Sequence, residues 1–241
     1  MKHLSFNSYI KFEKETLNYF ESPEGVKSGL HINKYYDTYI KDFQFKSGPK
    51  PEFNPWEYST FKTGKTLKDV YSTWGKIQKG FFISKRFKDF LSSFDIGEHL
   101  VFDGIKYFNG SEFKDDMSWI SFYEDYWNCL DFNHSKFVLY DITESSYKED
   151  GSENYIKNNI TFKDMEEYNK ELLNLQRTNL NISCYKGYIN TKLDLFPLFH
   201  ISSSTFIVSD RFSLRTKNEK FTGIEFFDSL FAFEPFASGS L

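Results

Sequence analysis

The spacing of apolar residues changes along residues 81–102, from the continuous run of a buried strand to the period of a helix. The strand is predicted at Phe81–Ile83, and Ser84 stands where its side chain can cap the first turn of the helix that follows. One helical face then carries apolar residues at i, i+3, i+4 and i+7, namely Phe87, Phe90, Leu91 and Phe94. Gly97 is expected in the left-handed conformation that ends a helix, before another apolar strand.

The same pattern returns near the C-terminus, over residues 206–227. A short apolar strand again ends at a serine, Ser209, and a helix is expected between it and Gly223. Aligning Ser209 with Ser84 also matches three neighbouring pairs: Val208 with Ile83, Arg211 with Arg86, and Phe212 with Phe87. The glycine follows the serine by 13 residues in the first copy and by 14 in the second. The sequence therefore predicts two related strand–helix–strand repeats.

The matched arginines are informative because arginine is rare in this chain, which has 26 Lys and only 4 Arg. Arg86 and Arg211 could each reach a carboxylate or the carbonyls of a helix end and so fix the joint between strand and helix. Alternatively, both could contact a partner protein, since arginine is enriched at the centres of interfaces. We favour the structural interpretation.

Outside the repeats, the pattern predicts short strands, few helices and polar loops. In the first half, we expect strands at Leu4–Phe12 and Tyr35–Phe45, a loop at Ser47–Pro55, a short helix at Thr66–Trp74, and tight turns at Asp103-Gly104 and Asn109-Gly110. In the second half, we expect strands at Trp119–Asp131, Lys136–Ile142, Ile182–Ile189 and Leu193–Ile201, a polar loop at Thr143–Asn154, and an amphipathic helix at Met165–Leu175 capped by Asp164.

This order of elements predicts an α+β fold with a mostly antiparallel sheet, the two repeats and a few short helices. With 241 residues, the chain can form one large domain or two small ones. We expect an aromatic-rich N-terminal segment, residues 1–75, packed on a main α+β body of residues 76–241 that contains the repeats.

Composition narrows the class of protein. Aromatic residues make up 20% of the chain and charged residues 27%, a balance that excludes intrinsic disorder. No apolar run approaches the ~20 residues of a membrane span. The net charge of −4, without a basic stripe, argues against a nucleic-acid partner. The N-terminus lacks a secretory apolar region, and two cysteines, Cys129 and Cys184, cannot form a disulfide scaffold, so we expect a cytoplasmic protein.

Catalytic and cofactor motifs are not found. Residues 63–66 resemble the end of a P-loop, but Ser59 stands where its first glycine is required. The five histidines have no metal-ligand spacing with either cysteine, so no metal or cofactor is expected. Ser84 and Ser209 lie outside any nucleophile elbow, and helix capping explains both. We therefore expect no enzymatic activity.

The C-terminal repeat resembles the DUF1629-type immunity proteins of bacterial polymorphic toxin systems. Members carry a strand ending in V-S-[ED]-R and then a T-G-x-E-F strand, which stand here at residues 208–211 and 222–226. Further similarity lies at 129–135, like the family's aromatic strand ending in D-x-x-x-S, and at 195–201. The resemblance covers residues 75–235 and implies a cytoplasmic protein that binds and neutralises a cognate toxin, without cofactor or catalytic residues. It leaves the oligomeric state open.

For such a partner, we expect contacts from an acidic and aromatic stretch: Asp115, Asp116, Trp119, Tyr123, Glu124, Asp125 and Trp127. The loop Thr143–Asn154 is a second candidate. An alternative function is a carbohydrate-binding or carbohydrate-active protein, in which exposed aromatic rings form a sugar platform and two carboxylates act as acid and base.

Overall fold

The computed structural model describes residues 6–12, 18–19, 25–63, 67–72, 77, 79–141, 158–175, 178–200 and 206–235. The chain divides into a larger unit, residues 8–127 and 192–227, and a smaller unit, residues 1–7, 128–191 and 228–241. This division does not follow the expected boundary at residue 75, because the main sheet uses strands from both sides of it. The fold is α+β with mostly antiparallel strand pairs, as the sequence predicts.

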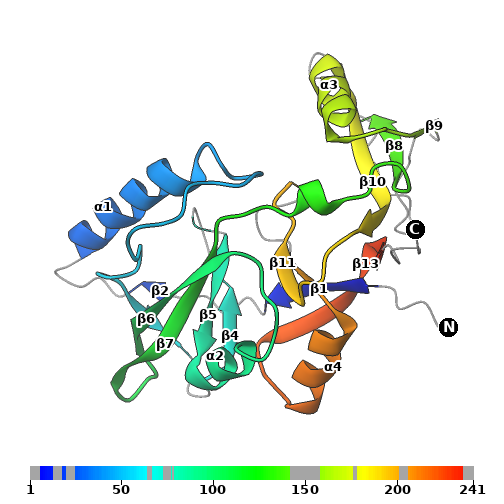
Figure 1. Cartoon of the computed structure of the whole chain (residues 1–241). Coiled ribbons are helices and arrows are strands. Elements are labelled where there is room, and N and C mark those ends of the chain that lie inside the picture. The colour runs from blue at the N-terminus through cyan, green and yellow to red at the C-terminus, as the bar shows by residue number, and fades with distance from the viewer. Residues whose placement is uncertain are drawn as a thin grey trace. The chain divides into compact units, whose positions relative to one another are not determined.

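A six-stranded sheet in the order β2-β3-β6-β7-β5-β4 forms the centre of the larger unit (Figure 1). Its strands are β2 (Asn18–Tyr19), β3 (Thr60–Lys62), β4 (Val70–Ser72), β5 (Gly80–Ser84), β6 (His99–Phe108) and β7 (Phe113–Phe122). Neighbouring strands are antiparallel except β3 and β6, which are parallel. A second set of strands pairs in the order β11 (Leu195–Pro197), β12 (Phe206–Val208) and β1 (Phe6–Phe12).

The helices of the larger unit are α1 (Gly25–Tyr35), the π-helix η1 (Tyr36–Ile40) that continues it, α2 (Lys85–Leu91) and α4 (Asp210–Asn218). Each repeat has the predicted order, because α2 follows β5 directly and α4 follows β12 after one residue (Figure 1). A 3-10 turn, η2 (Trp127–Cys129), follows β7, and β13 (Ile224–Pro235) follows α4.

The central strands of the six-stranded sheet are buried on both faces. Along β5, Phe81 and Ile83 belong to one hydrophobic cluster and Phe82 to another, as the two-residue period of a strand requires. Strand β7 repeats this division, with Ile120 in the first cluster and Trp119 in the second. Burying each of these large side chains stabilises the fold by roughly 1.5–3 kcal/mol.

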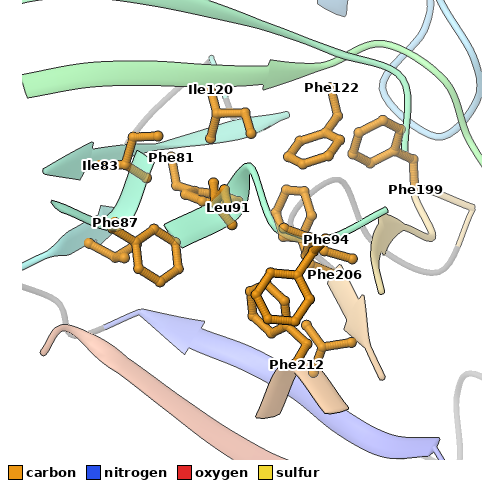
Figure 2. Close-up of a cluster of buried hydrophobic side chains, with 13 residues drawn as sticks. Phe81, Ile83, Phe87, Leu91, Phe94, Ile120, Phe122, Phe199, Phe206 and Phe212 are labelled. Atoms are coloured by element: carbon orange, nitrogen blue, oxygen red, sulfur yellow. The ribbon is translucent and has the colours of Figure 1, made fainter. Parts of the chain in front are cut away.

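Both repeats contribute to the first cluster (Figure 2). Phe81 and Phe87 come from the first repeat, and Phe206 and Phe212 from the second; each is at most 1% exposed. The Phe87 and Phe212 rings meet edge to face at 6.5 Å. The two helices are therefore held by one shared core rather than by separate ones.

The second cluster covers the other face of the sheet, and it corrects one prediction. Tyr35–Phe45 was expected as a strand, whereas Tyr35 ends α1 and Tyr39 and Ile40 lie in η1. These three side chains are buried in the second cluster together with Trp56. Tyr39 and Ile40 follow Tyr35 by four and five positions, so the three side chains meet on one face of the continuous helix. The same apolar positions were read from the sequence as the alternation of a strand.

Two further predictions in this region are wrong. The helix expected at Thr66–Trp74 is replaced in its described part by β4, where Val70 packs in the first cluster and Tyr71 in the second. The hairpin turn expected at Asp103-Gly104 is a bulge inside β6, with a register shift between Phe102 and Ile105. Gly104 has a φ of +74°, so it permits the bulge rather than a turn. The predicted turn at residues 109–110 does join β6 to β7.

The smaller unit pairs its strands in the order β13-β10-β8-β9, with β8 (Lys136–Asp141), β9 (Asn158–Ile160) and β10 (Leu180–Ile189). Its helix, α3 (Met165–Leu175), matches the prediction, and Asp164 Oδ1 accepts a hydrogen bond from the Glu167 amide at 2.9 Å as a cap. Tyr168 of α3 packs on Phe137 and Phe162.

Two predictions on other segments remain. The strand expected at Trp119–Asp131 ends earlier, at Phe122. The loop 143–154 lies outside the described residues.

Candidate functional site

The two predicted cap serines have nearly identical surroundings. Ser84 has φ −69° and ψ 159°, and Ser209 has φ −69° and ψ 157°. Ser84 Oγ accepts a hydrogen bond from the Phe87 amide at 3.2 Å, and Ser209 Oγ accepts one from the Phe212 amide at 3.0 Å. Both serines therefore cap their helices, and the repeat is confirmed at the level of single atoms.

Each serine is also bound to an aspartate fifteen residues earlier in the chain. Ser84 Oγ donates to Asp69 at 3.0 Å, and Ser209 Oγ donates to Asp194 at 2.6 Å. The serine amides donate to the carbonyls of the same aspartates, at 2.8 Å in both repeats. Asp69 and Asp194 were not predicted from the sequence, although their equal spacing from the two serines was available as a signal.

The matched arginines complete these joints. Arg211 binds Asp194 through Nε at 3.1 Å and through a second guanidinium nitrogen. Arg86 lies 3.7 Å from Asp69 and donates to the backbone carbonyl of Glu219. Burial alone would raise the pKa of Asp194, but the Arg211 guanidinium and the Ser209 hydroxyl outweigh it and lower that pKa. The structural interpretation of both arginines is confirmed.

Each aspartate reaches across to the other repeat. Asp194 Oδ2 accepts a hydrogen bond at 3.1 Å from the amide of Asp95, which follows α2. Asp69 Oδ2 accepts one at 2.9 Å from the amide of Thr222, which follows α4. Asp95 and Thr222 therefore play equivalent parts in the two repeats. In each repeat, the aspartate binds the segment that follows the helix of the other repeat.

Arginine side chains also reach across to the other repeat, where they lie over phenylalanine rings. The Arg86 guanidinium lies 4.2 Å from the centroid of Phe221, in the second repeat, and that of Arg211 lies 5.2 Å from Phe94, in the first. Arg215 also lies over Phe94, at 5.2 Å. These cation–π contacts join the repeats, so the three arginines stabilise the seam between them.

The two predicted glycines differ. Gly97 was expected in the left-handed region, but the positive-φ residues of the described chain do not include it. A Cβ there would lie 2.7 Å from a ring carbon of Tyr126, so close packing accounts for this glycine. Gly223 does have a positive φ, +83°, but α4 has already ended and Lys220, at φ 55°, takes the left-handed position after it.

The stretch predicted to bind a partner is divided by the structure. Asp115 and Asp116 are exposed in the first half of β7. Trp119 and Trp127 are only 0% and 4% exposed, so they are core residues and the prediction of partner contact is corrected for both. Half-buried Tyr123 donates its hydroxyl hydrogen to Glu98 at 2.8 Å.

Asp125 and half-buried Glu124 lie near a buried lysine. Asp125 accepts a hydrogen bond from the Phe199 amide at 2.8 Å, and burial raises its pKa to about 6. Lys79, 1% exposed, donates to the Lys46 carbonyl, and burial lowers its pKa to about 8 against the opposing charges of Asp125 and Glu124. These groups fasten loops inside the larger unit.

The end of the β6–β7 hairpin is the exposed part of the predicted surface. Phe113 is 68% exposed, the largest exposure among the large hydrophobic side chains described. Asp116 accepts the Tyr107 hydroxyl hydrogen at 2.7 Å, and Lys114 pairs with Glu112 at 3.0 Å. Asp115 lies exposed between them in sequence. We call Glu112–Asp116 the hairpin end.

A groove of about 440 Å³ lies at the other end of β6, beside α2. We call it the α2 groove. Its apolar lining is Ile83, Leu91, Phe94, Ile96, Val101, Ile120 and Leu193, and its polar lining is Lys88, Ser92, Asp95 and His99. An apolar floor with a few polar groups at the rim is the usual composition of a binding site.

Two absences concern only the part of the chain that the structure describes. No group of three or more His, Cys, Asp or Glu side chains there could hold a metal ion. None of its helices is both long and apolar enough to cross a bilayer. Comparisons with protein-family models, curated proteins and solved structures find no match to this chain.

Proposed function

We propose that the chain is a cytoplasmic immunity protein that binds a cognate bacterial toxin and blocks its activity. The observation that carries the proposal is the hairpin end, where a largely exposed phenylalanine, Phe113, stands beside exposed carboxylates. An apolar anchor rimmed by charge is a typical protein contact. The resemblance of residues 206–227 to the DUF1629-type immunity proteins supplies the class of partner.

The alternative, a carbohydrate-binding protein, has weaker support. A sugar platform needs exposed aromatic faces. Trp56, Trp119 and Trp127, the three tryptophans that the structure describes, are at most 4% exposed.

Co-expression with the toxin encoded beside this gene tests the proposal. The wild-type chain should restore growth, and the two purified proteins should elute together on a sizing column. Phe113→Ser combined with Asp115→Lys should weaken binding by about tenfold or more, because the apolar anchor and a carboxylate are both lost. Leu214→Ser is the matched control, since Leu214 is 61% exposed on α4 but lies outside the hairpin end.

Thermal melting of each variant should match the wild type, so that lost binding cannot be attributed to unfolding. A wild-type chain that neither rescues growth nor forms a complex would overturn the proposal. Binding that survives the double substitution would remove the hairpin end as its basis.

A further inference from the structure

The two repeats pair their strands in the same register on one side of the cap serines. The strand that ends at the serine is β5 in the first repeat and β12 in the second. Antiparallel β4 pairs Val70 with Ile83 of β5, and antiparallel β11 pairs Leu195 with Val208 of β12. Val70 and Leu195 each follow a joint aspartate directly. The repeat therefore includes β4 and β11 as equivalent strands.

On the other side, the register is again the same. Strand β5 pairs with antiparallel β7, where Ile83 is opposite Ser118. Strand β12 pairs with antiparallel β1, where Val208 is opposite Ser8. Ile83 and Val208 are equivalent, because each precedes its cap serine. Ser8 therefore takes the place of Ser118, and β1 takes the place of β7.

The amino-acid sequences of these two strands agree with this register. Residues 8–12 read S-Y-I-K-F, and residues 118–122 read S-W-I-S-F. The serine, the isoleucine and the phenylalanine are identical at matched positions, and the residue after the serine is aromatic in both strands. Strand pairing and residue identity therefore select the same alignment of β1 with β7.

Strand β6 has a counterpart as well. It contains a Phe-Asp pair at residues 102–103, which follow the first cap serine by 18 and 19 positions. Strand β13 contains the same pair at residues 227–228, at the same distances from the second cap serine. In the first repeat, Ser118 Oγ donates to Asp103 Oδ1 at 2.5 Å, and both residues of this bond recur in the sequence of the second repeat.

The order of these elements along the chain differs between the repeats. The first repeat runs β4, β5, α2, β6 and β7 without interruption. The second runs β11, β12, α4 and β13, and its counterpart of β7 is β1, at the other end of the chain. The second repeat is therefore circularly permuted, and its last strand is the first to be synthesised.

We propose that the side of β12 opposite β11 is a strand-binding site for an extended segment of the pattern Ser-aromatic-Ile-x-Phe, and that β1 is the chain's own occupant. An added strand of this kind is held by main-chain hydrogen bonds. Ser8 precedes its partner Val208 by 200 residues, so no short loop ties β1 to this site. Because β11 pairs with the opposite side of β12, that pairing remains when β1 is withdrawn.

Peptide complementation of the full chain tests the inference. Ile10→Pro removes a backbone amide from β1 and should weaken its pairing with β12. Two peptides, residues 4–14 with the β1 sequence and residues 114–124 with the β7 sequence, should each raise the melting temperature of this variant by about 5 °C or more at saturation. The β7 peptide is the decisive one, because only the equivalence of β7 and β1 predicts that it binds.

Three controls accompany this measurement. The wild-type chain should shift by less than about 1 °C with either peptide, because its own β1 acts at a millimolar effective concentration. A peptide with the β7 composition in scrambled order should stabilise neither chain. Ile160→Pro, in β9 of the smaller unit, is the matched variant, and neither peptide should raise its melting temperature.

A second pair of variants keeps the inference testable if Ile10→Pro does not fold. Tyr9→Trp combined with Lys11→Ser gives residues 8–12 the sequence of residues 118–122, and the melting temperature should stay within about 4 °C of the wild type. Ser8→Tyr combined with Tyr9→Ser keeps the composition but displaces the pattern by one position. It should lower the melting temperature by at least about 6 °C.

The outcomes decide the inference without reference to any toxin. Stabilisation of Ile10→Pro by both peptides supports it, and a folded Ile10→Pro that the β7 peptide fails to stabilise overturns it. If that variant does not fold, equal losses in the two double variants overturn the inference, and a loss confined to the displaced pattern supports it. Failure of the proposed function would leave each of these results unchanged.

Discussion

Gly223→Ala should be among the most damaging single substitutions in the larger unit. Gly223 has a φ of +83°, and a Cβ placed on it would lie 2.0 Å from the Val70 carbonyl oxygen. That oxygen belongs to the backbone of β4, so a side-chain rotation cannot relieve the contact. The chain must move at the point where Thr222 is bound to Asp69 and to the Val70 amide.

Gly104→Ala provides the control that isolates this contact. Gly104 has a similar φ, +74°, but nothing lies within 4 Å of the position that a Cβ would take. The control should therefore cost only the backbone strain, about 1–2 kcal/mol. Gly223→Ala should cost the same strain plus the loss of roughly two hydrogen bonds at the joint, for a total of about 3–5 kcal/mol.

Thermal unfolding followed by tryptophan fluorescence is the suitable assay. All four tryptophans lie within residues 8–127, so the signal reports the larger unit without the smaller one. At typical scaling, the control should lower the melting temperature by about 2–8 °C and Gly223→Ala by at least 6 °C. Equal losses for the two variants would refute the steric argument and leave φ as the only cause.

Three further outcomes follow from the joints and from the buried lysine. Ser84→Ala and Ser209→Ala should each cost about 1–2 kcal/mol in urea unfolding, because each removes a helix cap and a bond to an aspartate; unequal losses beyond that range would argue against equivalent joints. The pKa of Asp194 in the folded chain lies below its ordinary value of 3.8. The ionised carboxylate therefore stabilises the fold above pH 3.8, and this stabilisation is lost as the pH falls through the folded-state pKa. Asp194→Asn should reduce the loss of stability with acid that is measured below about pH 4. The pKa of Lys79 is lowered from 10.5 to about 8, so between pH 8 and pH 10.5 the unfolded chain binds more protons than the folded one. The free energy of unfolding should therefore rise with pH in this range, and Lys79→Met should flatten the rise. An unchanged pH dependence in the variant would contradict the burial effect.

Local features of the repeats could be predicted from sequence because they depend on nearby residues. A cap serine acts on an amide three residues away, so Ser84 and Ser209 were recognisable without knowledge of the fold. The aspartates of the joints act over fifteen residues and were missed. At Gly104, the Asp-Gly pair has the composition of a hairpin turn, but the pairing of β6 with β7 over its full length converts it into a bulge.

The candidate site was only partly predictable for a related reason. Asp115 and Asp116 are exposed, as a partner contact would require, but Trp119, four residues after Asp115, is fully buried in a cluster with residues of β5 and α1. Burial of an aromatic residue depends on which distant segments cover it, and composition alone does not contain that information. The α2 groove was not predicted at all, because its lining comes from β5, α2 and the segment that follows it, β6, β7 and Leu193.

The hydrogen bonds between the two repeats also determine when the first repeat can be completed during protein synthesis. Asp69 leaves the ribosome 153 residues before its partner Thr222, and Arg86 leaves 133 residues before Glu219. At 5–20 residues per second, the first repeat waits roughly 8–30 s for the contacts that close it. During that time Phe87, Phe90 and Phe94 lack the rings of Phe212 and Phe221 that they pack against, so part of the first repeat's apolar surface stays uncovered until the second repeat has emerged.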